Sequence, residues 1–117
     1  MITSFKELEI YIRSKELLKQ VYQITEKYPE REKYNVISQL RRSILSVPLN
    51  IAEGYGRKSR EEFKRFLKIS LGSSNEVEAL LDISKELRYI NEEEYKKLSK
   101  ENDEIGKMIY RTIEKWK

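Results

Sequence analysis

The sequence contains neither cysteine nor histidine, and it has only four glycines and two prolines in 117 residues. Without cysteine the chain can form no disulfide and no thiolate metal site, and nothing points to an oxidising compartment. Without histidine it also lacks the commonest general base and the usual transition-metal ligand. We therefore expect no catalytic site, no metal and no cofactor.

Long apolar runs are missing as well. No stretch approaches the roughly 18 apolar residues of a membrane span, and the N-terminal segment lacks the basic flank and continuous apolar core of a signal peptide. We therefore expect a cytoplasmic protein with no membrane partner. A chain of 117 residues fits one domain, residues 1–117, which buries roughly two thirds of its unfolded surface.

Charged residues make up 38% of the chain, and apolar residues recur at three- and four-residue steps, which is typical of helices. Capping-box spacing at Ser4, Ser59 and Asn91 predicts three helix starts. The first helix should run to about Tyr28, before a proline, and another should begin near residues 33–35. Short connections then predict an all-α, antiparallel up-down-up-down four-helix bundle.

The expected core faces follow from this spacing. In the second helix the face is Ile37, Leu40, Ile44, Val47 and Ile51. In the third it is Phe63, Phe66, Ser70, Ser73, Val77, Leu80, Ser84 and Leu87. In the fourth it is Tyr95, Leu98, Ile105, Ile109 and Trp116.

The second helix carries another stripe, rotated by roughly 120 degrees from its core face at about 100 degrees per residue. One core cannot bury both stripes, so the second predicts self-association. A proline in this helix cannot donate to the carbonyl four residues earlier, which predicts a kink there. The stripe is Arg42, Leu45, Leu49 and Ala52, and the expected interface is Leu45, Pro48, Leu49 and Ala52.

The end of the second helix holds two further features. Gly54 and Gly56 are interpreted as a helix terminator, because glycine accepts positive φ. Asn50 and Glu53 are interpreted as structural polar residues, with the carboxylate of Glu53 pairing with one of three nearby arginines, Arg41, Arg42 or Arg57.

Positive charge is concentrated in the middle of the chain. Residues 31–68 carry a net charge of +6, whereas residues 69–104 carry −5. Such segregation suits a polyanion or head-to-tail contacts between subunits, although a solvated helix surface is the plainer interpretation. Tyr55 lies among these cations, where it either stacks on an unpaired base or packs into an interface. The candidate nucleic-acid-binding residues are Arg41, Arg42, Arg57, Lys58, Arg60, Lys64, Arg65 and Lys68.

Several segments also carry a family resemblance. The resemblance is carried by three runs, QLRRS, SVPLNIAEGYGR and EEFKRFLKISLGSSNEVE. Together with fitting segments at both ends, they resemble the bacterial four-helix-bundle proteins encoded in large-subunit (23S) rRNA intervening sequences. That family is similar in turn to the accessory variability determinants (Avd-like proteins) of diversity-generating retroelements. The resemblance implies a ring-like homo-oligomer, expected to be a pentamer, that binds nucleic acid without enzymatic activity.

From these observations we expect a non-enzymatic oligomeric accessory or scaffold protein that binds structured RNA or DNA through backbone phosphates. The alternative is an adaptor whose basic surface docks an acidic protein, such as a reverse transcriptase. An enzyme is disfavoured by the missing histidine and cysteine.

Overall fold

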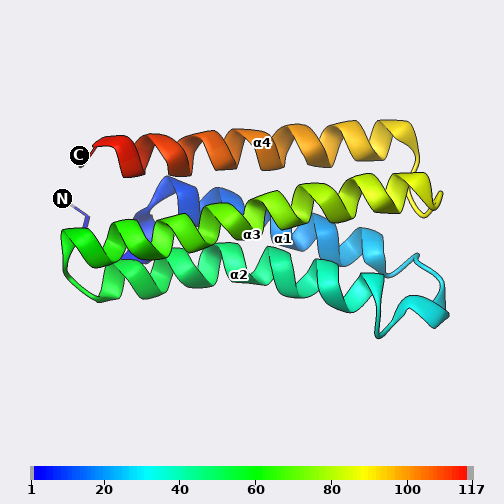
Figure 1. The fold of residues 1–117 in the computed structure, drawn as a ribbon, viewed down its shortest axis with the longest axis horizontal. Helices are drawn as coiled ribbons and strands as arrows, with labels where there is room; N and C mark the ends of the chain where they lie inside the picture. Colours follow the sequence, from blue (N-terminus) through cyan, green and yellow to red (C-terminus); the bar gives the residue numbers. More distant parts are fainter. Residues whose placement is uncertain (1, 116–117) are drawn as a thin grey trace.

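The computed structural model describes residues 2–115 and is built from four long helices. They are α1 (Glu9–Thr25), α2 (Val36–Gly56), α3 (Arg60–Glu86) and α4 (Glu92–Lys115), with short 3-10 turns at Phe5–Glu7 and Glu30–Glu32. No strand occurs among these residues. The helices lie side by side along a rod of 43 × 23 × 20 Å (Figure 1). The predicted all-α fold of four helices is confirmed.

Two of the three predicted capping boxes start a long helix. The hydroxyl of Ser59 accepts from the backbone N–H of Glu62 at the start of α3. At the start of α4, the Asn91 side chain accepts from the N–H of Glu94, and the Glu94 carboxylate accepts from the N–H of Asn91. Ser4 instead caps the short 3-10 turn, because Leu8 is extended and separates that turn from α1. The prediction that the first helix begins at Ser4 is therefore wrong, and α1 also ends before Tyr28, at Thr25.

The core face of α2 is confirmed in four of its five positions, since Ile37 alone is only half-buried. The predicted core face of α3 is confirmed at Phe63, Ser70, Val77 and Ser84. Phe66, Ser73 and Leu80 are only half-buried and Leu87 is exposed, because the helix turns Leu67, Ser74 and Leu81 toward the core instead. In α4 the core is Leu98, Asn102, Ile105, Ile109 and Ile113, while the predicted Trp116 lies outside the described residues. The buried face of α3 is Phe63, Leu67, Ser70, Ser74, Val77, Leu81 and Ser84.

Small residues let α3 lie close to both neighbouring helices. The hydroxyl of Ser70 donates to the carbonyl of Val47 in α2 at 2.8 Å, and that of Ser74 donates to Oδ1 of Asn102 in α4 at 3.1 Å. A larger side chain at either position would push the helices apart. α2 and α3 form the most extensive helix pair.

The glycines at the end of α2 have a different role from the predicted one. α2 ends at Gly56 as predicted, but Gly54 lies inside the helix and no glycine has a positive φ among the described residues. Positive φ falls instead on Lys58, at 55°, in the turn between α2 and α3. A Cβ built on Gly54 would lie 2.7 Å from Cβ of Phe66. This glycine is therefore required for close helix packing rather than for chain reversal.

Candidate nucleic-acid interface

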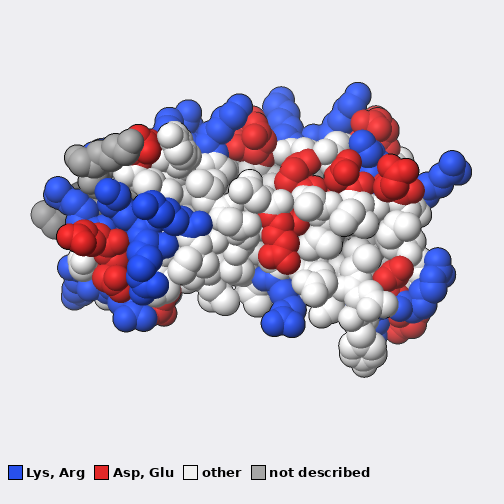
Figure 2. Space-filling view, viewed as in Figure 1, with Lys and Arg blue, Asp and Glu red and all other residues white. Residues whose placement is uncertain are grey.

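The turn between α2 and α3 brings several of the predicted cations to one end of the bundle. Arg57 closes α2 through its backbone N–H, which donates to the carbonyl of Gly54. Ser59 caps α3 two residues later, so cations of both helices flank a turn of only three residues. Figure 2 shows blue side chains gathered at this end of the molecule. Both helix ends thus contribute charge to the same small surface.

An aromatic ring organises two of these arginines. The guanidinium carbon of Arg57 lies 5.1 Å from the ring centroid of Phe66, and that of Arg65 lies 4.5 Å from it. Each arginine also pairs with a carboxylate, Arg57 with Glu53 at 2.9 Å and Arg65 with Glu62 at 3.0 Å. The Arg65 guanidinium holds the pKa of Glu62 below its usual range. The ring and the carboxylates therefore orient both guanidinium groups while leaving them about half exposed.

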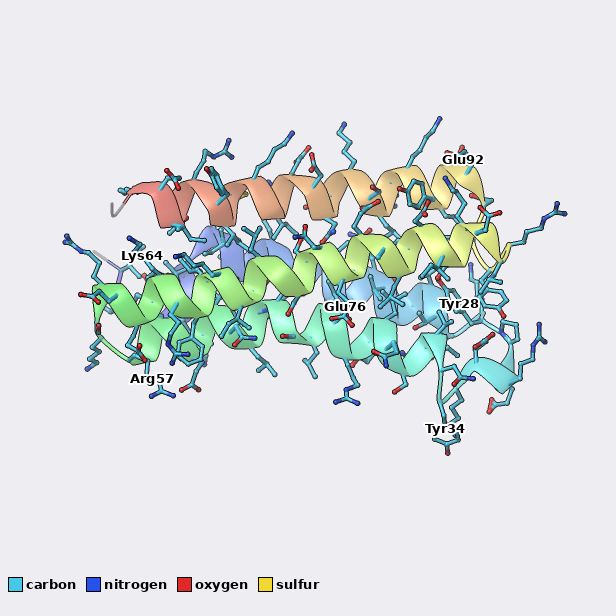
Figure 3. All side chains as sticks on the ribbon, in the orientation of Figure 1. Tyr28, Tyr34, Arg57, Lys64, Glu76 and Glu92 are labelled. Carbon is cyan, nitrogen blue, oxygen red and sulfur yellow. The ribbon has the colours of Figure 1, made fainter. Side chains whose placement is uncertain are left out.

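The remaining cations of this end extend along α3. Lys58 and Arg60 are exposed, and Lys64 is half-buried on the side of α3 that lies toward α4 (Figure 3). Lys68 lies one turn further along and makes no ion pair within residues 2–115. The end of the bundle therefore presents a band of positive charge that continues along α3.

Arg41 and Arg42 do not belong to this basic end. The Nε of Arg41 donates to the hydroxyl of Thr25 at 2.9 Å, and its guanidinium carbon lies 4.6 Å from the ring centroid of Tyr22. These contacts join α2 to α1, which makes Arg41 a packing residue. Arg42 is exposed but lies 15 residues before Arg57, or about 22 Å away along the helix. Arg41 and Arg42 therefore lie apart from the cations of the basic end, although all of them fall in one basic segment of the sequence.

The predicted second stripe of α2 faces outward. Leu45 is 41% exposed and Leu49 is 57% exposed. Ala52 is half-buried beside them, whereas Pro48 is buried within the subunit. Because Pro48 is buried, it can affect an interface only through the shape of α2. The helix continues through this proline. Ile69 and Ile83 of α3, and Leu87 just after it, are exposed apolar residues as well.

The structural interpretation of Asn50 and Glu53 agrees with their contacts. The side-chain amide of Asn50 donates to the carbonyl and the hydroxyl of Ser46, at 2.8 and 2.9 Å. The Ser46 hydroxyl lies 2.7 Å from that of Ser73, which links α2 to α3. Among its three predicted partners, Glu53 pairs with Arg57. No Asp or Glu cluster within residues 2–115 is arranged to hold a metal ion.

Tyr55 packs within its own subunit. Its hydroxyl donates to the carbonyl of Ile2 at 3.2 Å, and its ring meets Phe63 edge-on with centroids 6.0 Å apart. A ring held on two sides is poorly placed to stack on a base. Two exposed aromatics do lie among cations, Tyr34 beside Lys33 and Tyr110 of α4, which is 54% exposed between Lys107 and Arg111. The net positive charge of the last thirteen residues was the sequence signal for this site.

Comparisons with known proteins agree with this fold. The model of the 23S rRNA-intervening sequence protein family matches residues 6–111. A crystal structure of a protein with unknown function, from the S23 ribosomal protein family of Bacteroides thetaiotaomicron VPI-5482, superposes with a TM-score of 0.80 at 27% sequence identity. The match covers 89% of this chain and 97% of that one. None of the curated proteins matches. No helix within residues 2–115 combines the length and apolar character that crossing a membrane requires.

Proposed function

Because this chain belongs to the 23S rRNA-intervening sequence protein family, we propose that it is a non-enzymatic accessory protein that binds structured RNA or DNA as a homo-oligomer. The observation that carries the proposal is the basic end formed where α2 meets α3. Its cations approach from two helices and are exposed together (Figure 2). Clustered Lys and Arg side chains neutralise phosphates and release counterions, which supplies sequence-independent affinity.

The contacts of this end favour phosphate over base recognition. Arg57 and Arg65 are held against Phe66 and paired with Glu53 and Glu62, but they stay about half exposed, so each keeps further N–H donors that a phosphate can approach. The lysines offer point charges on flexible stems, which suit a phosphate backbone rather than one base pattern. The proposed binding therefore depends on the shape and charge of a folded nucleic acid.

Assembly is the second part of the proposal. Leu45 and Leu49 form an exposed apolar stripe on the outside of α2. Burial of this face against another copy would remove apolar area from water. A ring, for which we propose five subunits from the sequence resemblance to Avd-like proteins, would repeat the basic end around its axis. Each weak phosphate contact would then act multivalently.

A protein partner is the competing function. The same oriented arginines suit carboxylates as well as phosphates, so the basic end also fits an acidic protein surface such as that of a reverse transcriptase. In either case the chain would act as a scaffold. The non-enzymatic part of the proposal is supported by the missing histidine and cysteine and by the pairing of Glu53 with Arg57.

The test is a titration of the wild-type protein with duplex RNA, duplex DNA and an acidic polypeptide at several salt concentrations. The variant is Arg60→Glu/Lys64→Glu, in which acidic residues near the start of α3 remain compatible with the helix dipole. We expect weaker binding to both duplexes. The salt slope should be shallower by roughly 0.7 to 0.9 for each phosphate that the variant no longer neutralises.

The matched control is Lys19→Glu/Lys27→Glu, which changes net charge equally but on exposed positions outside the basic end. Weakening by both variants alike would indicate a non-specific charge effect. If the wild type binds the acidic polypeptide but neither duplex, the adaptor replaces the nucleic-acid function. Light scattering on each variant shows whether assembly is retained.

A further inference from the structure

A groove of about 750 Å³ runs between α3 and α4. The exposed leucines of α2 do not line it. Leu71 and Ser74 of α3 form part of its lining, together with Gly106 of α4. A Cβ built on Gly106 would lie 3.5 Å from the Ser74 hydroxyl and 3.7 Å from Leu71. Because this position has no side chain, the groove stays open beside Tyr110, one turn further along α4.

Most of the charge left unpaired in this groove is positive. Of its two acidic residues, Asp103 pairs with Lys107 at 3.0 Å, whereas Glu78 accepts from the neutral hydroxyls of Tyr95 and Ser99 and keeps its charge. By contrast, Lys100 and Arg111 line the groove without any ion pair to the described residues. An anion entering there meets cations that have no competing partner.

The register of the two helices gathers these cations around an aromatic ring. The side-chain amide of Asn102 donates to the carbonyl of Ser74 at 2.9 Å, and the helices run in opposite directions from that point (Figure 1). Lys68, Leu71 and Asn75 share the side of α3 that faces the groove, at steps of three and four residues. The antiparallel register therefore brings Lys68 level with Tyr110.

Tyr110 thus has the features of a stacking platform. It is 54% exposed, and among the described residues it makes no ring contact. Lys107 and Arg111 flank it on α4, and the spacing of Lys68 from Leu71 and Asn75 puts Lys68 on the side of α3 that faces the groove. An exposed ring amid cations binds single strands, because every base has a face that can stack while the cations hold the adjacent phosphates. A base inside a duplex cannot present that face.

We propose that the groove between α3 and α4 binds a single-stranded segment of nucleic acid, with one base on Tyr110 and the flanking phosphates on Lys68 and Arg111. The inference rests on the proposed function and adds to it, because the basic end contacts only the backbone of a folded nucleic acid. Glu78 and Asp82 continue the same side of α3 beyond Asn75. These carboxylates would repel phosphate, so the strand crosses near Tyr110 rather than following the whole groove.

The test measures anisotropy of a labelled oligouridylate and of an RNA duplex of equal length, with wild type, Tyr110→Ala and Tyr110→Phe. Loss of a stacked base costs about 1–3 kcal/mol, which corresponds to a loss of affinity between about fivefold and about 150-fold. We expect that loss for the oligouridylate with Tyr110→Ala. Tyr110→Phe keeps the ring and should bind it nearly as wild type does, and neither variant should change duplex affinity by more than about twofold.

The matched control is Tyr34→Ala, which removes an 84% exposed ring that points away from the bundle (Figure 3) and lies outside the groove. If duplex binds but Tyr110→Ala leaves the oligouridylate affinity unchanged, this inference is overturned while the proposed function stands. If wild type binds neither RNA, this inference is overturned, and the proposed function is overturned with it when duplex DNA is not bound either. A change of particle mass in Tyr110→Ala would identify the groove as a subunit contact and would also overturn the inference.

Discussion

Gly54 of α2 faces the Cβ of Phe66 in α3 so closely that a Cβ on the glycine would lie 2.7 Å from it. The same Cβ would lie 3.1 Å from the ring of Phe63. These contacts are tighter than van der Waals packing allows, so the absence of a side chain determines how closely the two helices approach. The contact also lies beneath the ring on which Arg57 and Arg65 are oriented.

Gly54→Ala should therefore destabilise the protein despite the higher helix propensity of alanine. Overpacking of this kind costs about 1–3 kcal/mol, and chemical denaturation with circular dichroism measures it. The control is Gly72→Ala, because a Cβ there would meet nothing within 4 Å. We expect Gly72→Ala to raise stability by roughly 0.5–1 kcal/mol. Equal stabilisation by both substitutions would show that α2 and α3 are not in close contact at Gly54.

Asn102 is a buried polar residue whose hydrogen bonds join α4 to α3. It is 3% exposed, and both its amide oxygen and its amide nitrogen bond to Ser74. Asn102→Leu leaves the buried Ser74 hydroxyl without this acceptor and should cost about 1–3 kcal/mol. Ser74→Ala/Asn102→Leu removes both partners and should recover part of that loss. A double-mutant cycle of unfolding free energies checks this, and additive effects would exclude direct coupling.

Leu49→Asp tests the exposed apolar stripe of α2. The side chain is 57% exposed in the subunit, so the fold should tolerate the change. If the stripe is covered by another copy, an unpaired carboxylate in that interface costs several kcal/mol and the assembly should dissociate. Light scattering would report a smaller particle with unchanged helical circular dichroism.

Ile12→Asp is the matched control for this prediction. Ile12 is 44% exposed, but it lies on α1, away from the α2 stripe. Its substitution should leave the particle mass unchanged. A wild-type protein that already has the mass of one chain would contradict the proposed assembly.

Arg13 should make stability depend on pH in the acid range. Its Nη2 lies 2.7 Å from Glu101 and 2.8 Å from Glu104, which ties α1 to α4. The hydrogen bond from Arg13 lowers the pKa of Glu104 below 4.5. The interaction contributes its full stabilisation at pH values above the ordinary pKa of a glutamate. That stabilisation is lost as the pH falls through the lowered pKa of the folded state, because the unfolded chain binds the proton at a higher pH.

Arg13→Met keeps much of the aliphatic stem but removes these bonds, so its melting temperature should fall below that of wild type at neutral pH. The difference should shrink as the pH falls below 4.5. Lys19→Met, an exposed position on the same helix, serves as the control and should show neither effect. A difference that stays constant with pH would indicate poorer packing of the methionine rather than removal of the ion pairs.

The helices themselves follow from local features of the chain. Apolar residues at steps of three and four, together with side-chain caps at Ser59 and Asn91, determine that helices form and where α3 and α4 begin. These signals act between residues close in sequence. For the same reason the core face of α2 and the outward position of Leu45 and Leu49 could be predicted from the sequence.

Part of the candidate site was predictable in the same way. Arg57, Lys58 and Arg60 lie beside one turn, so their common location needs only the end of one helix and the start of the next. Arg41 is different, because its position depends on Thr25 and Tyr22, far away in the chain. Charge alone did not distinguish an arginine that packs from one that faces solvent.

Only the tertiary structure decided how each helix is rotated and which residues of different helices lie level. Two neighbouring stripes of α3 are both partly apolar, so periodicity could not choose Leu67 over Phe66 for the core. The contact of Tyr55 with Ile2 and the hydrogen bonds between Ser74 and Asn102 depend in the same way on packing between distant segments. Helix formation is a local property of this sequence, whereas rotation and register minimise the energy of the whole core at once.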